Sequence, residues 1–430
     1  MKAFNTFNAE LRRNLLVLFT AGLLFWSSMA SLLPTLPLYI NDVGASKQEI
    51  GIVMGSFAIG LLLSRPMLGR LADERGRKIV LLIGTIVAAI APFGYLATRS
   101  LGLLILVRIF HGISVAAFTT GYSALIADLA PAETRGEIIG YMTLATPLGL
   151  AIGPALGGYL EATSGYGILF LLSAELGFVA LLGIVQVTNP PVQTQEQTEG
   201  NDVYDGLRLR NFWQILGSPR VRVPTIVMLL VGLSVGAVHT FVSLFLKSTE
   251  VDFNGGLFFT AGAISSFSIR MFAGKASDRF GRGLFITFGI FCYVLALILL
   301  WQADSAIVFL LAAIAEGAGG GTLISMIITM MADRSLPQER GQIFAICIAG
   351  LDLGIAIAAP ILGTIAELVG YRNMFAYGAV ITSLALVIFL TQSSKDLSNS
   401  LRFALGLAPD AYALNNLKVR SNLKVRSQEV

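Results

Sequence analysis

Long apolar runs alternate with short polar connections along most of the chain. Twelve runs hold about twenty residues or more, enough for a helix to cross a ~30 Å hydrocarbon core. Membrane strands would be ~10 residues long with alternating polarity, so the pattern predicts an all-α polytopic membrane protein with twelve transmembrane helices. The runs lie at residues 14–40, 48–68, 79–98, 101–127, 137–160, 166–187, 224–247, 254–274, 284–302, 305–331, 341–366 and 372–392.

The longest polar connection divides these runs into two sets of six. It spans residues 188–223 and is rich in Gln and Glu, a composition typical of a flexible linker. We therefore predict an N-terminal six-helix bundle over residues 1–187, a C-terminal six-helix bundle over 224–392 and a flexible tail over 393–430. The tail contains the hexapeptide NLKVRS twice in succession, which we interpret as a duplication.

Charged residues are sparse and unevenly distributed. They form 13% of the chain, against roughly 25% in soluble domains, which excludes a water-soluble fold. Of the 30 Lys and Arg residues, 23 fall in connections on the side of the N-terminus and 4 on the other side. Because positively charged loops remain in the cytoplasm, both termini and the linker are predicted to be cytoplasmic, in a membrane that we expect to be the bacterial inner membrane.

Other classes of function lack the residues that they need. With two cysteines and two histidines, the chain offers no Cys-based or His-rich metal site. The net charge of +4 is not gathered into basic clusters with aromatic residues, so no nucleic-acid partner is expected. No cofactor loop or pair of nucleophile and base is found, so we predict no cofactor and no enzymatic activity.

The two halves are repeats of each other at a spacing of 205 residues. The register holds without a gap over about 100 residues and includes charged loop positions, which shared apolar composition does not explain. Six helices per half give both halves the same orientation, a parallel repeat found in transporters that move two bundles about a central site. The matching pairs include Arg65 with Arg270, Asp73 with Asp278, Arg77 with Arg282, Asp128 with Asp333, and Gly149 with Gly354.

The connection between the second and third runs reads GRLADERGRK and is repeated as GKASDRFGR. Glycines permit close approach and a tight turn there. The motif resembles the signature loop of the major facilitator superfamily, apart from Glu74, where Arg is usual. That resemblance implies that Asp73 and Arg77 hold the two halves together on the cytoplasmic face, with Asp128 as a charge partner. The residues assigned to this gating motif are Gly69, Asp73, Gly76, Arg77, Asp128, Asp278 and Arg282.

The fourth run contains Arg108 and His111 in the sequence LILVRIFHGISVAA. A charged Arg within a membrane helix costs about 2.5–3.5 kcal/mol on insertion scales, so it needs a partner or a wet cavity. The segment is similar to the superfamily's fourth-helix motif, whose Arg is linked to proton transfer. The alternative is an Arg that supports only packing.

The fifth run contains the string Gly-x-x-x-Gly-Pro-x-x-Gly-Gly. Glycines at this spacing line one face of a helix and allow tight packing. The full string resembles the antiporter motif of the drug:proton antiporter families, to which the end of the first run is also similar. The motif residues are Gly149, Gly153, Pro154, Gly157 and Gly158.

Buried ionisable residues are candidates for proton coupling, because acids within a membrane are costly and mark ion pathways. Glu316 is the first candidate, since it is the 205-residue counterpart of His111. Asp352 is the second and Glu175 the third, and Arg108 and His111 complete the set. The alternative is that the acids only form hydrogen bonds to neighbouring helices.

The function predicted from these features is proton-coupled export of a small amphipathic organic compound by a monomer in the lipid bilayer. The substrate site is expected between the halves near the midplane. The alternatives are a proton-coupled importer of a sugar or organic anion, and a membrane sensor or enzyme. The candidate substrate-binding residues are Trp26, Ser31, Phe118, Tyr122, His239 and Ser243, with His111 and Glu316.

Overall fold

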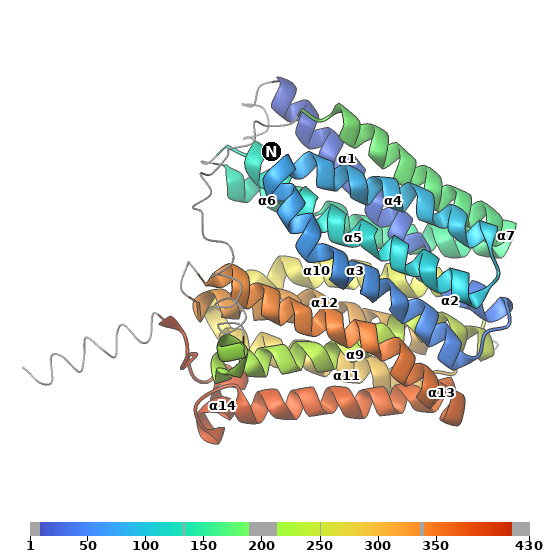
Figure 1. The fold of residues 1–430 in the computed structure, drawn as a ribbon. Coiled ribbons are helices and arrows are strands. Elements are labelled where there is room, and N and C mark those ends of the chain that lie inside the picture. The colour runs from blue at the N-terminus through green and yellow to red at the C-terminus, as the bar shows by residue number, and fades with distance from the viewer. Residues whose placement is uncertain (1–8, 132–133, 189–212, 250, 336–338, 415–430) are drawn as a thin grey trace, which may run out of the picture. The chain divides into compact units, whose positions relative to one another are not determined.

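The computed structural model describes residues 9–131, 134–188, 213–249, 251–335 and 339–414, and within these ranges the chain forms helices and no strands (Figure 1). The linker residues 189–212 and both hexapeptides of the tail lie outside the described residues. The helices are α1 (Ala9–Ser31), α2 (Leu36–Asp42), α3 (Lys47–Arg75), α4 (Arg77–Ala97), α5 (Leu101–Leu129), α6 (Arg135–Met142), α7 (Ala145–Gln186), α9 (Pro219–Ser248), α10 (Gly255–Phe280), α11 (Arg282–Gln302), α12 (Ala306–Asp333), α13 (Arg340–Gln392) and α14 (Leu397–Ala404).

The prediction of twelve membrane-spanning helices is confirmed. Ten stretches of the described chain are long and apolar enough to cross a membrane. Two of them, Ile138–Gln186 and Arg340–Gln392, are each two helices joined at a glycine with non-helical backbone, Gly165 (φ 77°) and Gly370 (φ 81°). The two glycines are 205 residues apart, so the repeat seen in the sequence includes these sharp bends.

The first apolar run differs from its prediction in one detail. It was expected to form a single helix over residues 14–40, but α1 ends at Ser31 and α2 begins at Leu36. Pro34 lies in the turn between them and Pro37 in the first turn of α2. Because proline lacks an N–H group and disfavours helix in the residue before it, this pair interrupts the helix.

The described chain forms two compact units. Unit 1 comprises Met1–Gln195, Val238–Ala263 and Ala359–Tyr371. Within it α1 packs along α7, and α5 packs against both α3 and α4. Its core is built from apolar side chains of α1, α4, α5, α6 and α7. These contacts bury one apolar face of the helices and leave other large apolar side chains exposed.

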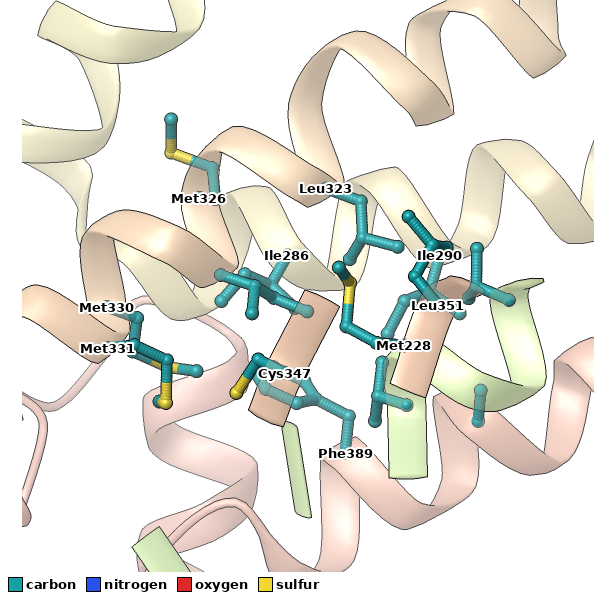
Figure 2. Close-up of a cluster of buried hydrophobic side chains, with 14 of the residues drawn as sticks. Met228, Ile286, Ile290, Leu323, Met326, Met330, Met331, Cys347, Leu351 and Phe389 are labelled. Atoms are coloured by element: carbon teal, nitrogen blue, oxygen red, sulfur yellow. The ribbon is translucent and has the colours of Figure 1, made fainter. Parts of the chain in front are cut away.

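Unit 2 comprises Glu196–Ala237, Ile264–Ala358 and Arg372–Val430. Figure 2 shows its core, in which branched aliphatic side chains meet several methionines and a free cysteine, Cys347. Methionine is unbranched and flexible, so it fills the irregular gaps between branched neighbours. The labelled core residues are Met228, Ile286, Ile290, Leu323, Met326, Met330, Met331, Cys347, Leu351 and Phe389.

Candidate functional site

Arg108 and His111 lie about one turn apart on α5 and are both buried, with 8% and 1% of their surface exposed. Their depth follows from the close packing of α5 against α3. A Cβ atom at Gly112 would lie 2.0 Å from the carbonyl oxygen of Phe57 on α3, so only glycine allows the two backbones to meet here. The glycine that follows His111 thus brings the polar residues of α5 against α3.

The Arg108 guanidinium makes two contacts with α3. Its Nη2 donates to the carbonyl oxygen of Met54 (3.3 Å), and its central carbon lies 4.4 Å from the centroid of the Phe57 ring. A cation over an aromatic face is stabilised by the ring quadrupole. The Nε–H group, by contrast, is buried without a hydrogen-bond partner. Arg108 is therefore a buried cation that retains an unused donor.

Tyr95 of α4 connects Arg108 to His111. Its hydroxyl lies 2.9 Å from His111 Nδ1 and also interacts with the charge of Arg108. Because the cation attracts the lone pairs of the hydroxyl oxygen, the hydroxyl proton is directed to His111 Nδ1. Neutral His111 then carries its ring proton on Nε2, an atom that is buried and has no hydrogen-bond partner.

The cluster therefore holds two buried N–H donors without acceptors, one on Arg108 and one on His111. A buried donor that lacks its partner costs about 1–3 kcal/mol. An acceptor such as a water molecule, a carbonyl or a carboxylate would remove that cost. The arrangement suits the transient binding of such a group within the membrane. Sequence reasoning missed Tyr95, which is 16 residues from His111 and belongs to no motif.

Glu316 on α12, in unit 2, has related surroundings. It is half-buried, and Glu316 and Arg270 both act electrostatically on the hydroxyl of Tyr293 from α11. The helix α11 is the repeat counterpart of α4. Each unit therefore places a tyrosine of this helix near a titratable residue of the helix that follows it in the chain. Each cluster combines an arginine, a tyrosine and a further titratable residue, although the arginines and the tyrosines occupy different positions in the repeat.

The other two acids differ in exposure. Asp352 is half-buried on α13, whereas Glu175 is exposed on α7. Phe178 and Leu182, which follow Glu175 at helical spacing, are exposed as well. Glu175 therefore lies on an outer apolar face, away from the core. The assignment of these acids to proton coupling stays a prediction.

The signature loop forms a network of ion pairs within unit 1. Arg77 pairs with Asp73 one turn earlier, and its Nε lies 3.5 Å from Asp128 at the end of α5. Gly76 has φ 98°, a conformation that glycine adopts without strain. At Gly69, a Cβ atom would meet nothing within 4 Å among the described residues of unit 1, so the close approach expected at this glycine stays a prediction. The role of the loop in holding the halves together stays a prediction.

The second copy repeats this network within unit 2. Arg282 pairs with Asp278 (2.9 Å) and, through Nε, with Asp333 (2.5 Å). Gly281, the counterpart of Gly76, has φ 91°. The equivalence therefore extends from sequence to backbone conformation and side-chain pairing.

The glycines of the fifth run pack α7 against α1. A Cβ atom at Gly153 would lie 2.5 Å from the carbonyl oxygen of Ser27, and one at Gly157 would lie 2.1 Å from that of Ser31. Gly149 makes a similar approach to α1. These backbone contacts permit no side chain, which accounts for the spacing of four residues.

The same motif also contacts the beginning of α10. Asn254 Nδ2 donates to the carbonyl oxygen of Gly158 (3.1 Å), and a Cβ atom at Gly256 would lie 2.1 Å from that of Pro154. Residues 254–256 belong to the second half of the sequence but to unit 1 of the structure. The motif therefore forms a close contact between the two halves of the sequence within one compact unit.

Further contacts between the sequence halves lie in unit 1. Lys247 Nζ pairs with Asp42 (2.8 Å), which also accepts from the Tyr166 hydroxyl (2.8 Å). The backbone N–H of Lys47 donates to Glu367 (2.9 Å). Sequence reasoning missed these pairs, which join residues of the two halves of the sequence.

Four of the predicted substrate-binding residues lie in the α1–α5 region of unit 1. Phe118 is fully buried and stacks on Phe25 (centroids 3.7 Å apart) and on Tyr122 (5.0 Å). Ser31 is also fully buried and donates within its own helix, whereas Trp26 is half-buried. These residues lie on the neighbouring helices α1 and α5, and Trp26 is the most exposed of the four.

The remaining two predicted residues lie on α9. His239 is half-buried and lies edge-on to Phe259 of α10, with the two ring centroids 5.6 Å apart. Ser243 is buried, and its hydroxyl has no hydrogen-bond partner. Both belong to unit 1, so α9 brings them to the first half of the sequence. Their contact with substrate stays a prediction.

Comparisons with known proteins agree on the family. The family model of the Major Facilitator Superfamily matches residues 18–301 and 252–420. Quinolone resistance protein NorA from Staphylococcus aureus is 27% identical over 304 residues, which cover 68% of this chain and 75% of NorA. An uncharacterised transporter of this type from Methanocaldococcus jannaschii is 26% identical over 88% of this chain and 98% of its own. A crystal structure of a mutant of the nucleoside transporter NupG has a TM-score of 0.75 at 16% identity, covering 87% of this chain and 98% of NupG.

Proposed function

The chain belongs to the Major Facilitator Superfamily, and we propose that it exports a small amphipathic organic compound in exchange for protons. Its family makes it a multi-pass membrane transporter of small molecules and not an enzyme. The proposal adds the direction of transport, the class of substrate and the coupling ion.

The observation that carries the proposal is the buried cluster of Arg108, Tyr95 and His111. A charged group within a membrane helix is costly and marks a substrate or ion pathway. Here the cation is accompanied by a histidine, and both keep a buried donor without an acceptor. A passing acceptor group or a water that carries protons would bind these donors.

Support for export comes from the glycine string of α7 and from a relative whose name refers to quinolone resistance. We infer that the protein acts as a monomer in the bacterial inner membrane with both termini in the cytoplasm. Reporter fusions in the linker and after α14 should then behave as cytoplasmic. A periplasmic signal at either point would overturn the orientation.

The test is transport in proteoliposomes under an imposed pH gradient. A panel of cationic dyes and amphipathic drugs should move against the proton flow, and an uncoupler should abolish the movement. Arg108→Gln should remove coupled transport, Arg108→Lys should restore part of it, and Arg99→Gln, at an exposed position, should leave it unchanged. Movement of substrate in the same direction as protons would instead support the importer.

A further inference from the structure

The short helix α14 is stabilised at both of its ends. The Asp396 side chain accepts from the backbone N–H of Asn399 (2.8 Å), which caps the first turn. After the last turn, Gly406 has φ 74°, and the N–H groups of Gly406 and Leu407 donate to Phe403 and Arg402. This is a Schellman ending, in which a glycine with positive φ satisfies the last carbonyl groups. The sequence therefore defines α14 as a separate element after the last membrane helix.

Contacts within unit 2 hold α14 in place. A helix of eight residues is marginal by itself in water, so its position depends on packing. Phe403 is buried and lies against Phe389 of α13, and the carbonyl oxygen of Ala404 accepts from Thr287 of α11 (2.8 Å). The following chain is held by an ion pair between buried Arg334 and Asp410 (2.7 Å).

One face of α14 is apolar and uncovered. Leu397, Leu401 and Leu405 recur at every fourth residue and are 56%, 39% and 50% exposed; we call them the leucine face. At 3.6 residues per turn, this face lies beside the face that packs on unit 2. The exposed polar residues Ser398, Asn399 and Arg402 occupy the third face.

The leucine face continues an apolar surface at the beginning of α11. The turn after α14 is in contact with that helix, because a Cβ atom at Gly406 would lie 3.2 Å from Cβ of Leu284. Leu284 is exposed, as are Phe288 and Phe291 farther along α11, which is one of the membrane-spanning helices. An exposed apolar stripe on such a helix faces the lipid chains. The leucine face therefore lies at the margin of the lipid-facing surface.

We propose that α14 lies in the membrane interface, with its leucine face among the lipid chains and its basic residues at anionic phospholipid headgroups. Lys395 and Arg402 are exposed on and just before α14, and Arg279 is exposed at the end of α10, where the carbonyl oxygen of Phe280 would lie 2.5 Å from a Cβ atom at Gly406. A helix with an apolar face and a polar face that carries basic residues binds in the plane of the interface. Each basic residue near an anionic membrane surface raises the affinity of the helix for that membrane roughly fivefold. Anionic phospholipid thus matches both the apolar and the charged part of the surface.

The test is a spin-label scan of the full-length protein in vesicles of phosphatidylcholine mixed with phosphatidylglycerol. Single cysteines replace residues 397, 398, 399, 401, 402 and 405 in turn, and the parent, whose two cysteines are buried, gives the background. Labels on the leucine face should be severalfold more accessible to oxygen than to a water-soluble nickel chelate. Labels at 398, 399 and 402 should show the reverse ratio.

The headgroup requirement has its own control. Omitting phosphatidylglycerol should lower the oxygen-to-nickel ratio at residue 401 severalfold. In the Lys395→Gln/Arg402→Gln chain, the same omission should have little effect. A ratio at 401 that is the same with and without phosphatidylglycerol in the parent would overturn the role of the anionic headgroup.

Two outcomes of the scan would overturn the lipid contact. Labels on the leucine face that respond to the nickel chelate as those at 398 and 399 do would show a surface in water. Labels that neither reagent reaches would show that protein covers the face, either the tail after residue 414 or a second copy of the chain. Truncation after residue 414 distinguishes these two, because it exposes the face only in the first case.

Discussion

Tyr95 is the residue that determines the state of the buried cluster on α5. By donating to His111 Nδ1, with its oxygen toward the charge of Arg108, it occupies the one nitrogen at which neutral His111 could accept a proton. A role of His111 as a base therefore requires that the Tyr95 hydroxyl turn away. Rotation of the hydroxyl proton about the C–O bond is enough for this, because a tyrosine hydroxyl can accept as well as donate.

The first prediction tests that hydrogen bond. Tyr95→Phe keeps the ring but leaves His111 Nδ1 without its donor, so we expect a loss of about 1–3 kcal/mol and a lower melting temperature in detergent. Tyr377→Phe is the control, because Tyr377 is 51% exposed and surface changes are usually within about 0.5 kcal/mol. Equal melting temperatures for the two variants would contradict the buried hydrogen bond.

Glu316 carries the second prediction, which concerns coupling. Glu316→Gln should leave the protein folded and able to bind substrate but should uncouple export from the proton gradient, because glutamine has a similar shape and cannot release a proton. The measurement is substrate-induced proton movement in proteoliposomes under an imposed pH gradient. If Glu316→Gln still exchanges protons for substrate as the parent does, the carrier is another group, and Asp352 is the next candidate.

At the scale of the element, helix contacts depend on positions that permit no side chain. The third prediction is that Gly157→Ala destabilises the protein by about 1–3 kcal/mol, the usual cost of overpacking. Its Cβ would lie 2.1 Å from the Ser31 carbonyl oxygen, and backbone cannot rotate away as a side chain could. At Gly167, also on α7, a Cβ atom would meet nothing within 4 Å. Gly167→Ala should therefore melt within a degree or two of the parent, and an equal loss in both variants would refute the argument.

The fourth prediction concerns the cap of α14. Hydrogen bonds from the backbone and side chain of Asn399 lower the pKa of Asp396 below its usual value of 3.8. The cap therefore stabilises α14 above about pH 4, and its contribution is lost as the pH falls through the lowered pKa. A spin label at residue 401 should become more mobile in that acidic range. The Asp396→Asn side chain keeps an acceptor but does not titrate. In this variant, the increase in label mobility that comes from loss of the cap should be absent.

The helices could be predicted from the apolar runs, because a run of about twenty apolar residues crosses the hydrocarbon core as a helix that satisfies its own backbone hydrogen bonds. Helix interruption was harder to predict, because Pro34 and Pro37 could equally have bent a continuous helix. Pairs between residues of different helices could not be predicted, because nothing in the sequence relates Tyr95 to His111 or Asp42 to Lys247. Such pairs depend on which faces of the helices meet, and apolar runs do not specify those faces.

At the scale of the whole molecule, the duplication is preserved in backbone and side chains. The sharp bends at Gly165 and Gly370 are 205 residues apart, as are the turns at Gly76 and Gly281. Each signature loop places one arginine between two aspartates. The copies have nevertheless diverged, because the second is in contact with the turn after α14, where Gly281 lies near Gly406.

The last prediction compares the ion pairs of the two signature loops. Asp73→Asn leaves Arg77 with Asp128 at 3.5 Å, whereas Asp278→Asn leaves Arg282 with Asp333 at 2.5 Å and with the Ser277 hydroxyl at 3.2 Å. We therefore expect both changes to impair transport and the change in the first copy to be the more severe. The measurement is the transport rate at equal abundance in the membrane.

The size of the effect distinguishes a gate from a simple topology anchor. Asp73 and Asp278 are largely exposed, and exposed ion pairs contribute about 0.2–1 kcal/mol to stability. If the loop only anchors the chain, Asp73→Asn would therefore lower the stability and the transport rate only slightly. A loop that holds one conformation of the transport cycle would lower transport by about tenfold or more, a factor that corresponds to about 1.4 kcal/mol, while the melting temperature changes little. Normal transport by Asp73→Asn at normal abundance would remove the loop from the mechanism.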